Sequence, residues 1–268
     1  MIVWMSSYPR SGNTFFRVLI KQCLGFDTYS VYGEEKDVAP DEMGKNLVGA
    51  TLLPTNMDYD DLRKSENIYF IKTHGRFEQH MAQDRIVYLV RDGREATESY
   101  FHYVAKFGRI AYTRFELISG TAFVSSWGNH VENWLVRKQA NILLIRFEDL
   151  IKEPTSLMGK ISDFVGLPIT NDSIPTFETL QAANPKFFRA GRTNSWEKTW
   201  SQDEEAFFWY KNAAAMKRLG YGESANSTIP MHNESLSKEF EALRLALLSE
   251  LQQRFDTLDQ RLEQISKH

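Results

Sequence analysis

The chain has 268 residues, of which 42% are hydrophobic and 25% are charged, and its formal net charge is −3 at pH 7. This is the composition of an ordinary globular protein, without the overall positive charge that would indicate a nucleic acid or an anionic membrane as partner. The single cysteine, Cys23, excludes a disulfide within the chain and a Cys/His metal cluster around it.

Short apolar runs alternate with stretches of helical spacing, which predicts an α/β fold. The predicted strands are rich in β-branched and aromatic residues. They are Ile2–Met5, Ile68–Ile71, Ile86–Val90 and Ile142–Phe147. The predicted helices are Thr14–Leu24 (with Gly25 as its stop), Arg94–Phe107, Ala122–Lys138, Thr155–Val165 and Asp203–Leu219. This alternation predicts a single domain with a central parallel sheet flanked by helices, and ligands at the carboxyl ends of its strands.

The last part of the chain has a different pattern. We expect the domain to cover residues 1–222, a polar linker to cover 223–234, and an amphipathic helix to cover 235–268. Apolar residues from Phe240 to Ile265 recur at spacings of three or four, but three consecutive spacings of four break a strict heptad. Two readings stay open: a coiled coil that self-associates or binds a partner helix, and a helix packed on the body.

No feature of the sequence indicates a membrane or an exported location. The start of the chain, Met1–Met5, has neither a basic region nor an apolar core of signal-peptide length. No apolar run approaches the roughly 18 residues that a spanning helix needs. A cytoplasmic location is therefore expected, with no nucleic acid as partner.

A candidate anion-binding loop follows the first predicted strand. The segment 6–14 reads Ser-Ser-Tyr-Pro-Arg-Ser-Gly-Asn-Thr and leads directly into a predicted helix. Backbone N–H groups at a helix N-terminus attract anions, and Arg10 adds a permanent charge. The segment lacks the Gly-Lys-Ser/Thr ending of a Walker A loop. Many strand-to-helix turns use such residues for geometry alone.

Two more strand ends carry polar side chains. Lys72, Thr73 and His74 follow the second long apolar run, and Arg91 follows the third, with Ser99 about two helical turns later. A lone histidine is usually structural, and Arg91 could simply pair with Asp92. Their shared position at strand ends instead favours a ligand site.

Together these elements resemble the sulfotransferases that use 3′-phosphoadenosine 5′-phosphosulfate (PAPS), over roughly residues 1–222. The loop Tyr8–Thr14 is similar to that family's 5′-phosphosulfate loop, and Lys72-Thr73-His74 is similar to its catalytic triplet. Four further elements occur in the family's order: Arg91 with Ser99, Phe147-Glu148-Asp149-Leu150, Thr176-Phe177-Glu178, and Arg189-Ala190-Gly191 before Trp196.

The resemblance implies a P-loop-like sulfotransferase fold and a set of site residues. It implies catalytic roles for His74, Lys72 and Arg10. It implies donor binding by Arg10, Ser11, Gly12, Asn13, Thr14, Phe15, Arg91, Ser99, Thr176, Phe177, Arg189 and Gly191. No metal is implied, and the sequence shows no obvious metal site.

Departures from the family pattern suggest a member far from the animal cytosolic phenol and steroid enzymes. Arg10 stands where many members have lysine, and arginine cannot donate a proton at neutral pH. Phe15 stands where a tryptophan often stacks near the adenine, and Ala190 replaces a basic residue.

The expected reaction is direct in-line transfer of a sulfonate group to a hydroxyl or amine of a small-molecule or carbohydrate acceptor, with His74 as general base. One alternative is a catalytically silent nucleotide-binding or scaffold protein on the same fold. A small-molecule kinase with a P-loop is disfavoured, because the Walker lysine is missing. The acceptor loops, expected at Tyr29–Thr55 and Ala105–Thr121, are aromatic and suit either a sugar or an apolar molecule.

Overall fold

The fold was determined as a computed structural model. It describes residues 1–33, 42–108, 110–122, 124–135, 141–171, 173–174, 180 and 195–222. Residues Met1–Gly222 form one compact unit. The expected linker 223–234 and the expected tail helix 235–268 lie outside the described residues.

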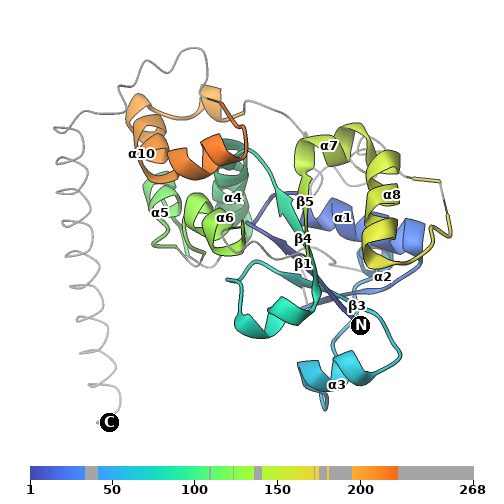
Figure 1. The fold of residues 1–268 in the computed structure, drawn as a ribbon. Helices are drawn as coiled ribbons and strands as arrows, with labels where there is room; N and C mark the ends of the chain where they lie inside the picture. Colours follow the sequence, from blue (N-terminus) through green and yellow to red (C-terminus); the bar gives the residue numbers. More distant parts are fainter. Residues whose placement is uncertain are drawn as a thin grey trace, which may run out of the picture. The chain divides into compact units, whose positions relative to one another are not determined.

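Five parallel strands form the central sheet, which confirms the predicted fold class (Figure 1). The strand order is β2 (Thr28–Ser30), β3 (Tyr69–Thr73), β1 (Ile2–Ser7), β4 (Arg85–Val90) and β5 (Ile142–Arg146). The chain therefore fills one side of β1 before it crosses to the other. Such a change of direction opens a crevice at the carboxyl ends of the strands, where ligands bind in open α/β sheets.

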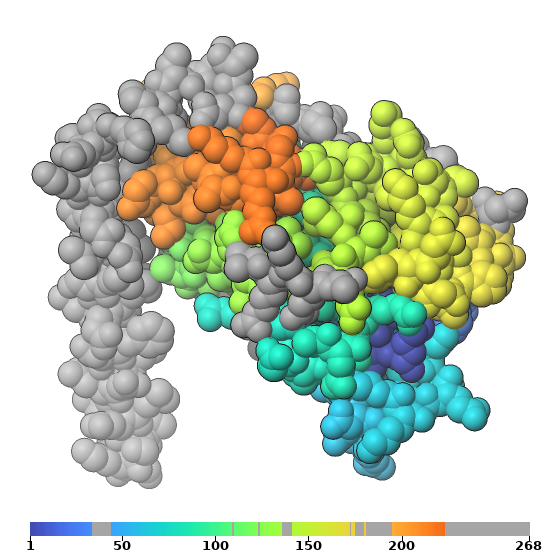
Figure 2. Space-filling view, viewed as in Figure 1, coloured from blue at the N-terminus to red at the C-terminus, as the bar shows by residue number. Residues whose placement is uncertain are grey.

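Helices cover both faces of the sheet (Figure 1). One layer contains α1 (Asn13–Leu19), α7 (Phe147–Lys152) and α8 (Pro154–Val165). The other layer contains α4 (Gly93–Phe107), α5 (Arg114–Ser119), α6 (Trp127–Leu135) and α10 (Gln202–Arg218). In the view of Figure 2, the surface of α10 (orange) lies on the left and that of α8 (yellow) lies on the right. Shorter elements are η1 (Ile20–Leu24), α2 (Glu42–Val48), α3 (Tyr59–Lys64), η2 (Gln79–Gln83) and η3 (Trp196–Lys198).

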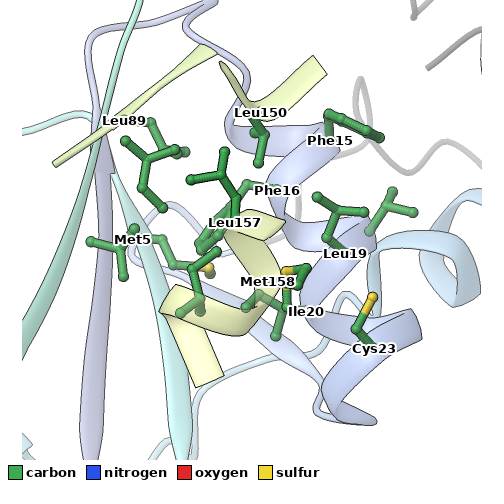
Figure 3. Close-up of a cluster of buried hydrophobic side chains, with 14 of the residues drawn as sticks. Met5, Phe15, Phe16, Leu19, Ile20, Cys23, Leu89, Leu150, Leu157 and Met158 are labelled. Atoms are coloured by element: carbon green, nitrogen blue, oxygen red, sulfur yellow. The ribbon is translucent and has the colours of Figure 1, made fainter. Parts of the chain in front are cut away.

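The main hydrophobic core lies between the sheet and α1, α7 and α8. Met5 of β1 and Leu89 of β4 meet Phe16 and Leu19 of α1 and Met158 of α8, all with their side chains fully buried (Figure 3). Alternate residues of a strand point to opposite faces, so Tyr88 lies on the other face and meets α6. Burial on both faces explains why these strands read as continuous apolar runs.

Most predicted elements are present, with shifted ends. The long helix predicted at Thr14–Leu24 is an α-helix that continues as the π-helical segment η1 and stops at Gly25 in the left-handed conformation, as expected. The helix predicted at Ala122–Lys138 begins only at Trp127, because the Ser126 hydroxyl accepts the N–H of Asn129 and caps it. Lys72 and Thr73 lie within β3 rather than beyond it.

One strand and four short α-helices were not predicted: β2, α2, α3, α5 and α7. Phe147, predicted as the last residue of a strand, is the first residue of α7. The helix α3 begins at a capping box in which Asp58 and Asp61 bond each other's backbone N–H groups. Helix α5 has the same arrangement between Thr113 and Glu116. Among the described residues, no helix is both long enough and apolar enough to cross a bilayer.

Candidate active site

The loop between β1 and α1 has an unusual backbone. Arg10 has φ +65° and Gly12 has φ +95°, both in the left-handed region that favours glycine. The Asn13 side chain donates to the carbonyl oxygen of Met5 at 3.1 Å and to the hydroxyl of Ser7 at 3.3 Å, so the loop is tied back onto its own strand. The result is a tight loop that ends at the N-terminus of α1.

The space around Gly12 is filled by an aromatic ring. A Cβ atom at Gly12 would overlap the ring of Phe147, the first residue of α7. The same ring lies under the guanidinium of Arg91, whose Cζ is 4.6 Å from the ring centroid. Next to Gly12, the hydroxyl of Ser11 is buried and has no hydrogen-bond partner among the described residues. A buried hydroxyl in this state fits a ligand that accepts a hydrogen bond.

His74 lies directly beside the loop. Its Nδ1 is 2.8 Å from the carbonyl oxygen of Ser7, the last residue of β1. A carbonyl oxygen can only accept, so Nδ1 carries the proton in this contact. In the neutral ring Nε2 then keeps its lone pair, which is the state that a general base requires.

The surroundings keep His74 neutral. Removal of water by the surrounding protein lowers the pKa of His74 well below 6.5, and the positive charge of Lys72 lowers it further. The Lys72 side chain is itself buried, with Nζ 5.8 Å from the centroid of the Tyr32 ring. An anion bound here would offset the Lys72 charge and raise the pKa of His74 again.

Tyr32 holds His74 from the other side. Its hydroxyl accepts the backbone N–H of His74 at 2.8 Å, and the two rings stack at 6.1 Å between centroids. Tyr32 is 42% exposed and lies beside His74 at the surface.

Arg10 and Arg91 join the loop to the third strand end. Arg10 Nε donates to the hydroxyl of Ser99 at 3.3 Å, and its guanidinium lies 5.2 Å from the centroid of the Tyr103 ring. Arg91 donates to the carbonyl oxygen of Arg10 at 3.3 Å and to the carboxylate of Glu95 at 3.2 Å. Arg91 therefore pairs with Glu95, and the Asp92 carboxylate pairs with Arg94 at 2.6 Å.

Two acidic residues of α4 bind the segment that begins at residue 195. The Glu95 carboxylate accepts both the N–H and the hydroxyl of Ser195. The Glu98 carboxylate accepts the Thr199 hydroxyl and the Trp200 indole N–H, each at 2.9 Å. Helix α4 thus links Arg91 and Ser99 to that segment.

The structure brings most of the predicted site residues together. Arg10, Ser11, Gly12, Asn13 and Thr14 form the loop and the start of α1, with Lys72, His74, Arg91 and Ser99 around it. Phe15 lies in the hydrophobic core and is 2% exposed (Figure 3). Its stacking on an adenine stays a prediction. Thr176, Phe177, Arg189 and Gly191 lie outside the described residues.

Sequence reasoning missed two residues of this site. Glu95 lies four residues after Arg91, a spacing at which oppositely charged side chains can pair, and this spacing is the signal that could have indicated it. His130 of α6 lies behind His74, 56 residues further along the chain, with Nε2 3.2 Å from the carbonyl oxygen of His74. No local pattern predicts such a contact.

Known proteins share both the sequence pattern and the fold. The profile of the family described as Sulfotransferase domain matches residues 2–218. Sulfotransferase 2A1 of Rattus norvegicus is 27% identical over 136 residues, which are 46% of this chain and 47% of the relative. Luciferin sulfotransferase of Photinus pyralis is 28% identical over 201 residues, or 64% of this chain and 52% of the relative.

Solved structures agree with this. The mouse sulfotransferase SULT7A1 complexed with PAP has a TM-score of 0.59 at 19% identity, covering 82% of this chain and 87% of that one. A retinol dehydratase in complex with androsterone and inactive cofactor PAP has a TM-score of 0.54 at 18% identity, covering 85% and 82%. At such identity these likenesses show the fold. The chain aligns with about half or less of the first curated relatives' length. Since the family profile spans most of the chain, the protein belongs to the sulfotransferase domain family.

Proposed function

We propose that the protein transfers a sulfonate group from PAPS to a hydroxyl or amine of a small-molecule or carbohydrate acceptor. The observation that carries the proposal is the contact between His74 and Ser7. This contact joins the imidazole to the end of the strand that leads into the loop, and it supports a ring with its proton on Nδ1 and a free lone pair on Nε2. Membership of the sulfotransferase domain family supports the same reaction.

The loop fits an anionic donor. The buried Ser11 hydroxyl, the N-terminus of α1 and the Lys72 ammonium all favour a negative group at one place. The left-handed Gly12 brings the backbone close to Phe147 and keeps the loop free of a side chain at that point. Arg91 and Ser99 would hold a second phosphate, which PAPS has on its 3′ position and ATP lacks.

The donor supplies an activated sulfonate, whose sulfur–oxygen bond to the phosphate breaks as the acceptor oxygen or nitrogen bonds to sulfur. His74 Nε2 takes the proton of the acceptor, while its Nδ1–H stays bonded to Ser7. Lys72 and Arg10 stabilise the negative charge that builds on the sulfonate and on the leaving phosphate oxygen.

The acceptor would lie against Tyr32. Its ring stacks on His74 and is partly exposed, so it offers a flat apolar surface next to the base. Such a surface suits an aromatic ring or the apolar face of a sugar.

The test follows two labels in parallel. The protein is incubated with a panel of phenols, amines and sugars and either PAPS labelled with ³⁵S or ATP labelled on its γ-phosphate. We expect label from PAPS in an acceptor and none from ATP. Phosphate transfer without sulfonate transfer would favour the kinase. Tight donor binding without transfer to any acceptor would favour the catalytically silent protein.

A further inference from the structure

Helix α6 holds the loop that carries the proposed base. His130 Nε2 contacts the carbonyl oxygen of His74 at 3.2 Å, and Trp134 Nε1 donates to the carbonyl oxygen of Gly75 at 3.1 Å. The backbone N–H of Phe77 donates to Asn133 Oδ1 at 2.7 Å. Residues 130, 133 and 134 lie on one face of α6, because three or four residues make one helical turn.

The loop needs these contacts because it lies outside the sheet. Strand β3 ends at Thr73, so the strand pairing of the sheet does not extend to the peptide groups of His74. Two side chains contact the backbone N–H and C=O of His74 instead. The Tyr32 hydroxyl accepts the N–H, and His130 Nε2 contacts the C=O. A backbone held on both sides leaves the His74 ring little freedom to shift.

The direction of the His130 hydrogen bonds follows from its partners. Nε2 faces a carbonyl oxygen and must donate, so in the neutral ring Nδ1 accepts from the Tyr88 hydroxyl at 2.8 Å. Tyr88 is fully buried in β4, and its ring stacks on that of His130 at 5.8 Å. Burial lowers the pKa of His130 to about 4, which keeps one proton on the ring near neutral pH.

We propose that His130, oriented by Tyr88, is a positioning residue that fixes His74 for proton transfer. This inference rests on the proposed function, since it assumes that His74 is the base. His130 touches the backbone of His74 and not its ring, so its effect acts through geometry. A displacement of about 1 Å at a reacting group can cost roughly a hundredfold in rate.

The experiment compares three variants in the label-transfer assay. His130→Ala removes the donor to the His74 carbonyl, and His130→Gln restores a donor at nearly the place of Nε2. Asn129→Ala changes an exposed neighbour on the same helix and serves as the matched control. The assay gives kcat and KM, and calorimetry gives the Kd of adenosine 3′,5′-bisphosphate.

We expect kcat to fall roughly 10- to 100-fold in His130→Ala with the bisphosphate Kd unchanged, and to recover in His130→Gln. Imidazole ¹⁵N spectra of the same variants show whether His74 keeps its proton on Nδ1. In His130→Ala we expect both His74 tautomers. Unchanged kcat and an unchanged His74 tautomer in His130→Ala would overturn the inference.

Two further variants separate the possible failures. Tyr88→Phe removes one hydroxyl and keeps the ring, so it tests the inference even where His130→Ala does not fold. We expect kcat to fall roughly three- to tenfold, the effect of one hydrogen bond, and an unchanged kcat would contradict the role of Tyr88. His74→Ala tests the base itself: full sulfonate transfer there would refute the role of His74 as base, and absence of transfer in wild type would refute the proposed function. Loss of transfer in His74→Ala with full activity in His130→Ala refutes only the inference.

Discussion

Ser7 and His74 are 67 residues apart in the chain, and Nδ1 of His74 donates to the carbonyl oxygen of Ser7 at 2.8 Å. This hydrogen bond joins the end of β1 to the residue that follows β3. It fixes both the place and the tautomer of the imidazole, and it leaves Nε2 as the basic nitrogen.

Replacement of His74 separates binding from transfer. In His74→Ala we expect transfer to fall by roughly 10²- to 10⁴-fold, the usual contribution of a general base. The Kd of the bisphosphate should stay nearly the same, because the loop residues and Arg91 are untouched. Arg10→Ala is the comparison, and it should weaken binding as well as rate. Normal turnover by His74→Ala would place the base elsewhere.

The pH profile of transfer should reflect the low pKa of His74. The base works only when deprotonated, and loss of water together with the charges of Lys72 and Arg10 lowers its pKa well below 6.5. The acid limb of kcat/KM, which reports the free enzyme, therefore lies below pH 6.5. Lys72→Met should move this limb to higher pH. A wild-type limb at or above pH 6.5 would show that His74 is not held as described.

Stability should fall on the acid side because of His130. Its pKa is about 4 when folded and about 6.5 when unfolded, so only the unfolded state takes up the proton between these values. The stabilisation is complete above pH 6.5 and is lost as pH falls towards 4. The free energy of unfolding should fall by about 3 kcal/mol over this range. Denaturant unfolding from pH 4 to 8 measures this slope. His130→Gln should flatten it, and an equal slope in both proteins would contradict the prediction.

The loop geometry predicts a penalty for a side chain at Gly12. Ala at this position would have a strained positive φ and a Cβ in contact with the Phe147 ring, so we expect a loss of roughly 1–3 kcal/mol in unfolding free energy. Bisphosphate binding should weaken too.

The matched control is Gly159→Ala in α8, where a Cβ meets no atom within 4 Å. Because alanine favours a helix over glycine, this change should stabilise the protein by up to about 1 kcal/mol. Equal effects of the two substitutions would mean that the Gly12 conformation is not required.

The sequence was informative where structure is local. The first strand, its loop and its helix are continuous in the chain, and their pattern predicted the loop that contains Arg10 to Thr14. The parallel sheet followed from the alternation of apolar runs, since strands buried on both faces contain few polar residues.

What the sequence could not show are contacts between distant segments. His130 meets the backbone of His74 only because α6 packs on the face of the sheet that carries Tyr88. Glu95 links Arg91 to Ser195, 100 residues further along the chain. The three-residue strand β2 is too short for a periodic signal, and its pairing with β3 decides its structure.

The central claim is that the protein uses PAPS as its donor. Its most direct test is whether the protein binds a nucleotide with a 3′-phosphate more tightly than one without it. Wild type and Arg91→Ala are each heated with adenosine 3′,5′-bisphosphate, 5′-AMP or ATP. At a hundredfold excess over Kd, a specific ligand stabilises by about 2.7 kcal/mol, a melting shift of about 5–10 °C for a protein of this size. For wild type we predict this melting shift with the bisphosphate and a much smaller shift with 5′-AMP and ATP. In Arg91→Ala the shift caused by the bisphosphate should be closer to the shift caused by 5′-AMP. Equal shifts by all three nucleotides with wild type would contradict a PAPS-dependent sulfotransferase.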